Sequence, residues 1–151
     1  MTPIRLLHVE DDALFCQIVR LAINGDKGVQ LDCVHDIESV PMALTPGKYD
    51  GVLLDLSLPD SKGIATLHRL REINGNVAII VITGVEITPE LHEALIEAGA
   101  DEVLGKDIWM ANRALVIARV EHAKAKADHR YMESIHHTFD RIYDRARALY
   151  A

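Results

Sequence analysis

Apolar residues along the first two thirds of the chain follow two different periods. Short apolar or alternating runs that end at turn signals or acidic residues are typical of strands. The sequence predicts five strands, at residues 4–9, 29–34, 51–54, 77–82 and 102–104. Between these runs, apolar residues recur every three or four positions, which is the period of an amphipathic helix. These segments predict helices at residues 13–24, 37–44, 63–73 and 88–98, and a fifth that begins near residue 108.

The order of strand and helix, repeated along the chain, predicts the fold class. It is typical of an α/β protein whose parallel sheet is covered by helices on both faces. Because crossovers are right-handed, few topologies remain. We expect a flavodoxin-like (βα)5 doubly wound parallel sheet with strand order 2-1-3-4-5. In that order, the carboxyl ends of the first, third, fourth and fifth strands meet at one edge.

Polar side chains follow each of these four strand ends. Glu10 and Asp11 come after the first run, Asp55 after the third, Thr83 after the fourth and Lys106 after the fifth. Carboxylates this close together repel one another unless a cation shares the site. Oxygen ligands suit a hard ion such as Mg²⁺, which keeps several waters and leaves room for a phosphoryl group. The sequence therefore predicts a Mg²⁺ site at this edge.

The same edge carries the groups that phosphoryl transfer requires. Asp55 is the candidate nucleophile, because it is the carboxylate placed between the metal ligands and Lys106. Lys106 can pair with Asp55 or with a phosphoryl oxygen, and Thr83 offers a hydroxyl donor. Phosphoryl transfer depends mainly on positioning and on neutralising oxygen charge, and this set supplies both.

These residues and their spacing resemble the receiver domain of the two-component response regulators, over roughly residues 3–125. The resemblance implies a signal-transduction protein that accepts a phosphoryl group from a sensor histidine kinase or a phosphotransfer protein. It implies Asp55 as the acceptor, Thr83 and Lys106 as contacts to the phosphoryl group, and Mg²⁺ as the cofactor. The metal ligands that it implies are Glu10, Asp11, Asp55 and the backbone carbonyl of Ser57.

Some positions depart from the pattern of the family. Val103 stands three residues before Lys106, where many receivers have Tyr or Phe, and Asp107 stands where a cis proline usually follows the lysine. A cis bond without proline costs about 3–4 kcal/mol, so we expect a trans bond. Both changes concern switching, not the phosphorylation site. Ser57 and Val85 offer neither a carboxylate nor an amide to orient water, so we expect slow dephosphorylation.

The carboxyl-terminal part of the chain has a different character. No Gly or Pro occurs from Lys106 to Ala151, so nothing local stops a helix that begins near residue 108. We expect residues 1–125 to form the receiver domain and residues 126–151 a helical extension that serves as a coiled coil or a linker.

Apolar residues in this extension follow a heptad pattern, with alternating steps of four and three. They are Ile135, Phe139, Ile142, Ala146 and Leu149, and a weaker continuation upstream uses Ile117, Val120, Ala127 and Tyr131. The pattern favours a projecting helix that forms a homodimer. The alternative is a hairpin that folds back on the body after a break near residues 128–129.

Histidines and cysteines give weaker signals. His122, His129 and His136 recur every seventh residue, about 10 Å apart along a helix, which is too far to share one ion. We therefore expect a solvated helix face, not a metal or phosphotransfer site. Cys16 and Cys33 lack the spacing of a disulfide framework or a zinc site, and we expect reduced core residues.

Charge and hydropathy argue against several function classes. The net charge is −7, with 8 basic and 18 acidic residues in 1–110 against 8 and 5 in 111–151. An acidic body disfavours direct binding to nucleic acid. The start of the chain resembles neither a signal peptide nor a membrane span, so we expect a cytoplasmic protein without membrane contact.

Two other functions remain open at this point. One is a receiver-like scaffold that dimerises through its last helix without switching, which Val103 and the long extension suggest. The other is a haloacid-dehalogenase-like phosphohydrolase, which also uses a nucleophilic Asp and Mg²⁺ but needs a second acid where Ser57 stands. A receiver is not an enzyme, apart from catalysing its own phosphorylation and dephosphorylation.

Overall fold

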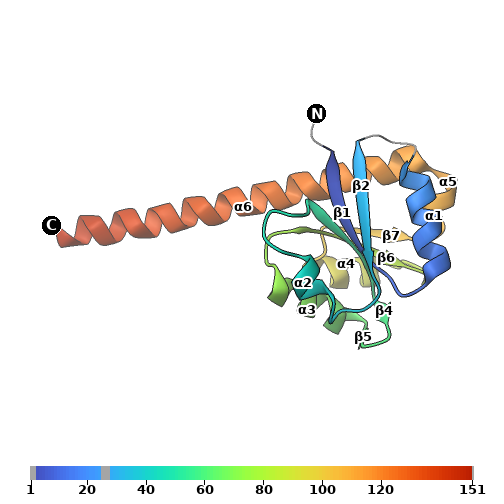
Figure 1. Cartoon of the computed structure of the whole chain (residues 1–151). Helices are drawn as coiled ribbons and strands as arrows, with labels where there is room; N and C mark the ends of the chain where they lie inside the picture. Colours follow the sequence, from blue (N-terminus) through green and yellow to red (C-terminus); the bar gives the residue numbers. More distant parts are fainter. Residues whose placement is uncertain (1–2, 25–27, 151) are drawn as a thin grey trace.

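The computed structural model describes residues 3–24 and 28–150, so the outer ends of the two predicted regions lie outside the described residues. Its centre is a five-stranded parallel sheet with the order β2-β1-β3-β6-β7 (Figure 1). The predicted order 2-1-3-4-5 is confirmed, since β6 and β7 are the fourth and fifth strands of this sheet. The strands are β1 Ile4–Val9, β2 Val29–Val34, β3 Gly51–Asp55, β6 Ala78–Thr83 and β7 Glu102–Gly105.

Helices cover both faces of the sheet. One face carries α1 Ala13–Asn24, α5 Ile108–Ala111 and the first part of α6 Arg113–Leu149. The other carries α2 Val40–Ala43, α3 Ile64–Ile73 and α4 Pro89–Glu97. Two separate apolar clusters result, because successive residues of a strand point to opposite faces. In β6, for example, Ile80 packs on the side of α1 and α6 and Val81 on the side of α3 and α4.

Local signals at the helix ends agree with the sequence in part. The Thr88 hydroxyl accepts a hydrogen bond from the Leu91 amide at 3.1 Å and caps α4, as expected. The second predicted helix is shorter than expected and covers only Val40–Ala43, with Pro41 in its first turn. A short hairpin of β4 Ser57–Leu58 and β5 Ser61–Lys62, which the sequence did not predict, follows β3.

The last helix does not run without interruption from residue 108, so that prediction is wrong. Asn112 adopts an extended backbone with φ −153°, which ends α5, and its side chain accepts a hydrogen bond from the Leu115 amide at 3.1 Å. Asparagine is a favourable N-cap, because its short side chain replaces a missing backbone acceptor. The chain therefore turns at Asn112 and starts α6 in a new direction.

Helix α6 spans 37 residues and extends well beyond the sheet (Figure 1). At 1.5 Å per residue its length is about 55 Å. Its first part packs on the body through Val116, Val120, Ala123 and Ala127. All residues from Tyr131 to Tyr150 are exposed, and no break occurs near residues 128–129. The helix projects, so the alternative of a folded-back hairpin is wrong.

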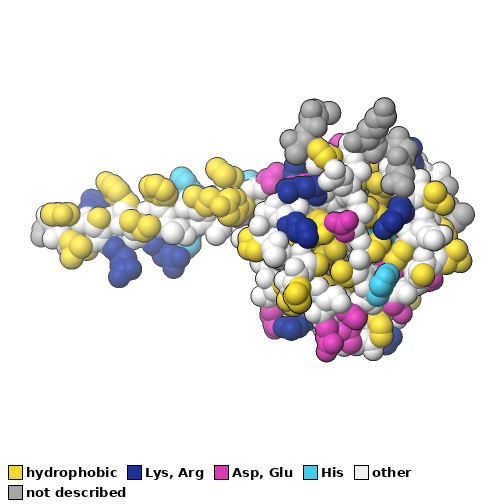
Figure 2. Space-filling model, viewed as in Figure 1, with side chains coloured by type: hydrophobic (Ala, Val, Ile, Leu, Met, Phe, Trp, Pro, Cys, Tyr) yellow, Lys and Arg dark blue, Asp and Glu magenta, His cyan; other side chains and the backbone are white. Residues whose placement is uncertain are grey.

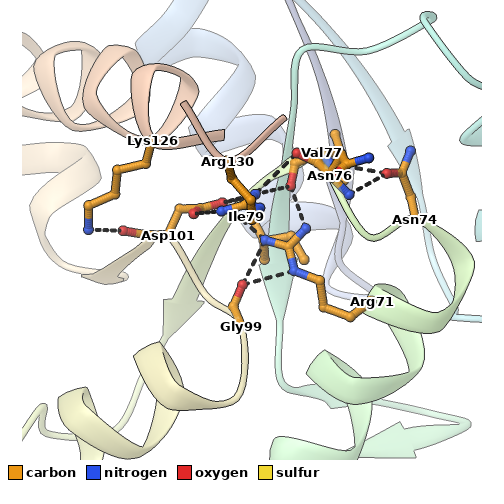
Figure 3. A network of polar contacts seen from close by, with 9 residues as sticks. All are labelled: Arg71, Asn74, Asn76, Val77, Ile79, Gly99, Asp101, Lys126 and Arg130. Atoms are coloured by element: carbon orange, nitrogen blue, oxygen red, sulfur yellow. Dashed lines mark hydrogen bonds and ion pairs between the residues drawn. The ribbon is translucent and has the colours of Figure 1, made fainter. Parts of the chain in front are cut away.

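A polar network fixes α6 where it leaves the body (Figure 3). Arg130 donates to both carboxylate oxygens of Asp101, at 2.6 and 3.2 Å, and Arg71 of α3 donates to the same carboxylate at 3.1 Å. Lys126 donates to the backbone oxygen of Asp101 at 2.9 Å, and the Ile79 amide to its side chain at 3.0 Å. Asp101 therefore joins α3, β6 and α6 at the amino-terminal edge of the sheet.

None of the helices in the described part of the chain is both long enough and apolar enough to cross a lipid bilayer.

Candidate functional site

Three carboxylates meet at the carboxyl-terminal edge of the sheet. Glu10 and Asp11 follow β1, and Asp55 is the last residue of β3, the neighbouring strand. Each side chain offers an oxygen, and these atoms lie within 4.8 Å of one another. Glu10 is fully buried and Asp55 is 6% exposed, whereas Asp11 faces solvent. We call Glu10, Asp11 and Asp55 the acidic cluster.

Lys106 is the cation beside this cluster. Its ammonium lies 2.6 Å from a carboxylate oxygen of Glu10 and 3.7 Å from one of Asp55. The sequence predicted a pairing with Asp55, and the structure adds a shorter contact to Glu10. The Lys106 amide donates to the Thr83 carbonyl at 2.9 Å. The Lys106 ammonium nitrogen lies over the Phe15 ring, 4.6 Å from its centroid. These contacts hold the ammonium over the site.

The acidic cluster carries more negative charge than Lys106 can neutralise. Burial and the neighbouring Asp55 carboxylate raise the pKa of Glu10, although Lys106 opposes the shift. Burial acts to lower the pKa of Lys106, but the hydrogen bond to Glu10 and the charge of Asp55 outweigh it and raise that pKa. The second carboxylate oxygen of Glu10 is buried without a hydrogen-bond partner among the described residues. Oxygen donors with an uncompensated charge fit a hard divalent cation such as Mg²⁺.

Asp55 also lines a cavity of about 430 Å³. Ser57, Thr83 and Lys106 line the same cavity, together with apolar residues from α3 and α4. The Ser57 amide donates to Asp55 at 3.2 Å, and the Val85 amide donates to the Thr83 hydroxyl oxygen at 3.2 Å. A small group bound to Asp55 would therefore be within the reach of a hydroxyl and an ammonium.

All of the predicted site residues thus lie at one edge of the sheet. The parallel register explains this, because Asp55 pairs with Ile82 of β6 and Thr83 pairs with Gly105 of β7. The two departures from the family lie close by. Val103 is buried in the core on the side of α3 and α4, and the Lys106–Asp107 peptide bond is trans, as expected.

Sequence reasoning missed a second group of side chains close to the acidic cluster. His8 of β1 is fully buried, and its parallel register partner is Cys33 of β2, whose sulfur lies 3.8 Å from the His8 Nδ1. Cys16 of α1 completes the group. Burial, followed by the Lys106 charge, lowers the pKa of His8 to about 4. If the predicted strands 4–9 and 29–34 are aligned from their first residues, His8 stands opposite Cys33. This alignment could have revealed the pair from the sequence.

One expectation about the histidine series needs correction. His122 does not belong to a purely solvated face, because its imidazole contacts the buried carboxylate of Glu102. Arg119 binds the same carboxylate at 3.1 Å. His129 is exposed and pairs with Glu133 one turn later, at 3.3 Å. His122 therefore helps to attach α6 to β7.

Comparison with known proteins gives a consistent picture. Residues 6–119 match the family model of the response regulator receiver domain. The transcriptional regulatory protein DltR of Streptococcus agalactiae is 34% identical over 102 residues, which cover 68% of this chain and 45% of DltR. The transcriptional regulatory protein PhoP of Escherichia coli is 33% identical over 117 residues, covering 78% of this chain and 50% of PhoP. The chain thus spans about half the length of these relatives.

Solved structures support the same assignment at the level of the fold. The receiver domain of the Francisella response regulator 1452 superposes with a TM-score of 0.68 at 21% identity. The match covers 81% of this chain and 97% of that domain. Together with the family match, which covers most of the chain, the fold and the strand-edge geometry lead to one conclusion. The chain belongs to the response regulator receiver domain family.

Proposed function

We propose that this chain is a phosphoryl acceptor in a two-component signalling system, with Asp55 as the residue that is phosphorylated. The observation that carries the proposal is the convergence of Asp55, Thr83 and Lys106 on one cavity beside the acidic cluster. The phosphoryl donor would be a sensor histidine kinase or a phosphotransfer protein. A location in the cytoplasm, where such donors expose their phosphohistidine, belongs to the same proposal.

In this mechanism a carboxylate oxygen of Asp55 attacks phosphorus, and a new O–P bond forms. The bond from phosphorus to the donor imidazole breaks, and the imidazole takes up a proton. The Ser57 amide, 3.2 Å from Asp55, orients the carboxylate for the attack. Lys106 and the Thr83 hydroxyl then hold the oxygens of the transferred group.

Glu10, Asp11, Asp55 and the backbone carbonyl of Ser57 would hold Mg²⁺ in this site. The unpartnered Glu10 oxygen and the excess of carboxylates over ammonium groups support this assignment. When bound, the ion supplies positive charge for the transferring oxygens. Lys106 alone carries one charge, whereas the acidic cluster carries up to three.

Labelling with acetyl phosphate tests the assignment of Asp55. Wild-type protein with Mg²⁺ should gain one phosphoryl group, measured by intact-protein mass spectrometry, and Asp55→Asn should gain none. Asp12→Asn is the matched control, because Asp12 follows the acidic cluster and caps α1, a role that Asn also performs. Equal labelling of the Asp55 variant and wild type would reject the proposal, and turnover of general phosphate esters would favour a phosphohydrolase instead.

We further propose that residues 126–151 serve as a helical extension of the receiver domain and that two copies of the chain pair through the part of it that projects. Large apolar side chains are exposed along the projecting half of α6 (Figure 2). They include Met132, Ile135, Phe139, Ile142 and Leu149, which together with Ala146 follow steps of three and four in one stripe. The upstream continuation is wrong, because Val120 and Ala127 are buried against the body of the same chain.

Light scattering with and without beryllofluoride, which mimics a phosphoryl group, tests this second proposal. Wild type should be a dimer, and Phe139→Glu should be a monomer that still accepts a phosphoryl group. Arg141→Glu, an exposed charge on the same helix outside the apolar stripe, is the control and should stay dimeric. A change in assembly on addition of beryllofluoride would support switching, whereas an unchanged dimer would favour the scaffold alternative.

A further inference from the structure

A histidine and two cysteines from three different elements meet between α1 and the sheet. His8 comes from β1, Cys16 from α1 and Cys33 from β2, and their donor atoms lie within 4.8 Å of one another. His8 Nδ1 and Cys33 Sγ lie 3.8 Å apart. We call these three residues the thiol cluster. None of them belongs to the acidic cluster.

The spacing of the thiol cluster suits a tetrahedral ion. Zinc binds sulfur at about 2.3 Å and imidazole nitrogen at about 2.0–2.1 Å, which places tetrahedral donor atoms about 3.5–3.8 Å apart. The 3.8 Å separation of His8 and Cys33 already lies at that value. The widest separation, at most 4.8 Å, needs to close by about 1 Å.

The chemistry of the donors selects the type of ion. Thiolate and imidazole prefer soft or borderline ions such as Zn²⁺, whereas the oxygens of the acidic cluster prefer Mg²⁺. Two thiolates and a neutral imidazole carry a total charge of −2, which a divalent ion balances. A buried site without net charge avoids the cost of burying an unpaired ion. His8 and Cys16 are 0% and 7% exposed, so this balance is important here.

An open cavity gives the thiol cluster a route to solvent. A space of about 580 Å³ is lined by Cys16 and Cys33, and by Arg20, His35 and Lys48. The cavity also leaves space for water as a fourth ligand. The two cysteines are free and form no disulfide with each other.

We propose that His8, Cys16 and Cys33 bind one thiolate-preferring divalent ion, of which Zn²⁺ is the representative. Binding releases the two thiol protons to solvent as two metal–sulfur bonds form, and His8 contributes a nitrogen lone pair. The fourth position faces the cavity. The site also touches the acidic cluster through the Glu10 backbone carbonyl, which lies 3.5 Å from the Cys16 sulfur and 2.9 Å from His35 Nδ1.

Titration of the reduced full-length chain with Co²⁺ tests this proposal. Co²⁺ occupies Zn²⁺ sites and gives a sulfur-to-metal charge-transfer absorption only when thiolates are ligands. We expect one Co²⁺ per chain with this absorption, and its displacement by one equivalent of Zn²⁺. Cys16→Ser and Cys33→Ser should each lose the band and weaken Zn²⁺ binding by more than about 100-fold, since even outer-shell changes cost 10–100-fold.

Two controls separate the thiol cluster from other metal ligands. His68→Gln removes an exposed histidine outside the cluster, and Asp55→Asn removes a member of the acidic cluster. Both should keep the band and the affinity. Circular dichroism of Cys33→Ser, whose residue is only partly buried, should match wild type and exclude misfolding as the cause. Absence of the band in reduced wild-type protein, or its persistence in both cysteine variants, would overturn the proposal.

Discussion

The two edges of the parallel sheet carry buried polar groups of opposite balance. At the carboxyl-terminal edge, three carboxylates face one ammonium, and an oxygen of Glu10 has no partner among the described residues. At the amino-terminal edge, the Asp101 carboxylate receives hydrogen bonds from Arg71, Arg130 and the Ile79 amide. The carboxyl-terminal edge has more carboxylates than cations, whereas the amino-terminal edge has two guanidinium groups on one carboxylate.

This difference separates a candidate ligand site from a structural network. Arg71 also donates to the backbone carbonyls of Gly99 and Val77 at 2.6–3.0 Å, and Arg130 donates to those of Asn76 and Val77 at 3.1 and 3.4 Å (Figure 3). The shared Asp101 carboxylate and the backbone carbonyls that accept from Arg71 and Arg130 link α3, β6 and α6, so the function of this network is to hold elements together. Unpaired buried charge is costly, and its presence at the other edge indicates a ligand site.

The largest effect is expected when the Asp101 network at the amino-terminal edge is broken. Asp101→Asn removes the charge that compensates Arg71 and Arg130, and breaking one side of a buried ion pair costs about 3–5 kcal/mol. We expect the free energy of unfolding in urea to fall by that amount. Asp144→Asn, on the exposed part of α6, should change it by less than about 0.5 kcal/mol. A similar small change for Asp101→Asn would mean that the network contributes little.

Near the carboxyl-terminal edge, protonation of His8 should lower the stability of the protein in acid. Its folded-state pKa of about 4 lies below the unfolded value of 6.5, so the unfolded chain binds the proton more readily. The stability that neutral His8 contributes is present above pH 6.5 and is lost as the pH falls towards 4. In metal-free protein this loss should reach about 3 kcal/mol. Urea unfolding of His8→Gln should show a weaker pH dependence, and His68→Gln the full one.

A smaller effect of the opposite sign is expected at Glu10. In the presence of a chelator at pH 8, Glu10→Gln removes one of the repelling carboxylates and should stabilise the protein by about 1 kcal/mol. Added Mg²⁺ should raise the melting temperature of wild type, because it binds only the folded site, but not that of Glu10→Gln. Destabilisation of the chelated variant would show that the Lys106 contact outweighs the repulsion.

An effect of similar size is expected at the turn that redirects the last helix. Asn112→Ala removes the side-chain acceptor of the Leu115 amide and should cost about 1 kcal/mol, whereas Asn112→Ser should keep most of the stability. Thermal melts followed by circular dichroism measure both variants. Equal melting temperatures for the two would assign the turn to packing around Trp109 and Val116 instead.

Much of this architecture could be predicted because the apolar runs are unambiguous. Once the strand order is known, Asp55, Thr83 and Lys106 must lie at one edge of the sheet. The Asn112 turn was not predicted, because one asparagine among strong helix formers is a weak local signal. The Asp101 network was missed because Arg71 and Arg130 have the pattern of surface residues. Their partners come from distant segments.

The thiol cluster shows a different limit of sequence reasoning. Cys16 and Cys33 are separated by a helix and a connection, so their spacing carries no metal signature. Only the register of β1 against β2, together with the packing of α1, brings them to His8. Spacing rules detect sites made within one segment. Sites made across three segments need the topology first.

Helix α6 is attached to the body at one end and projects into solvent at the other, so a small rotation where it is attached moves its far end a long way. About 20 residues beyond Arg130 extend roughly 30 Å into solvent, so a rotation of about 10° at the base displaces the far end by roughly 5 Å. The base is attached through Arg130, Lys126 and His122 to Asp101 and Glu102, at the start of β7. The other end of that strand leads directly to Lys106. The four-residue strand β7 thus connects the attachment point of α6 with Lys106, whose ammonium contacts the acidic cluster.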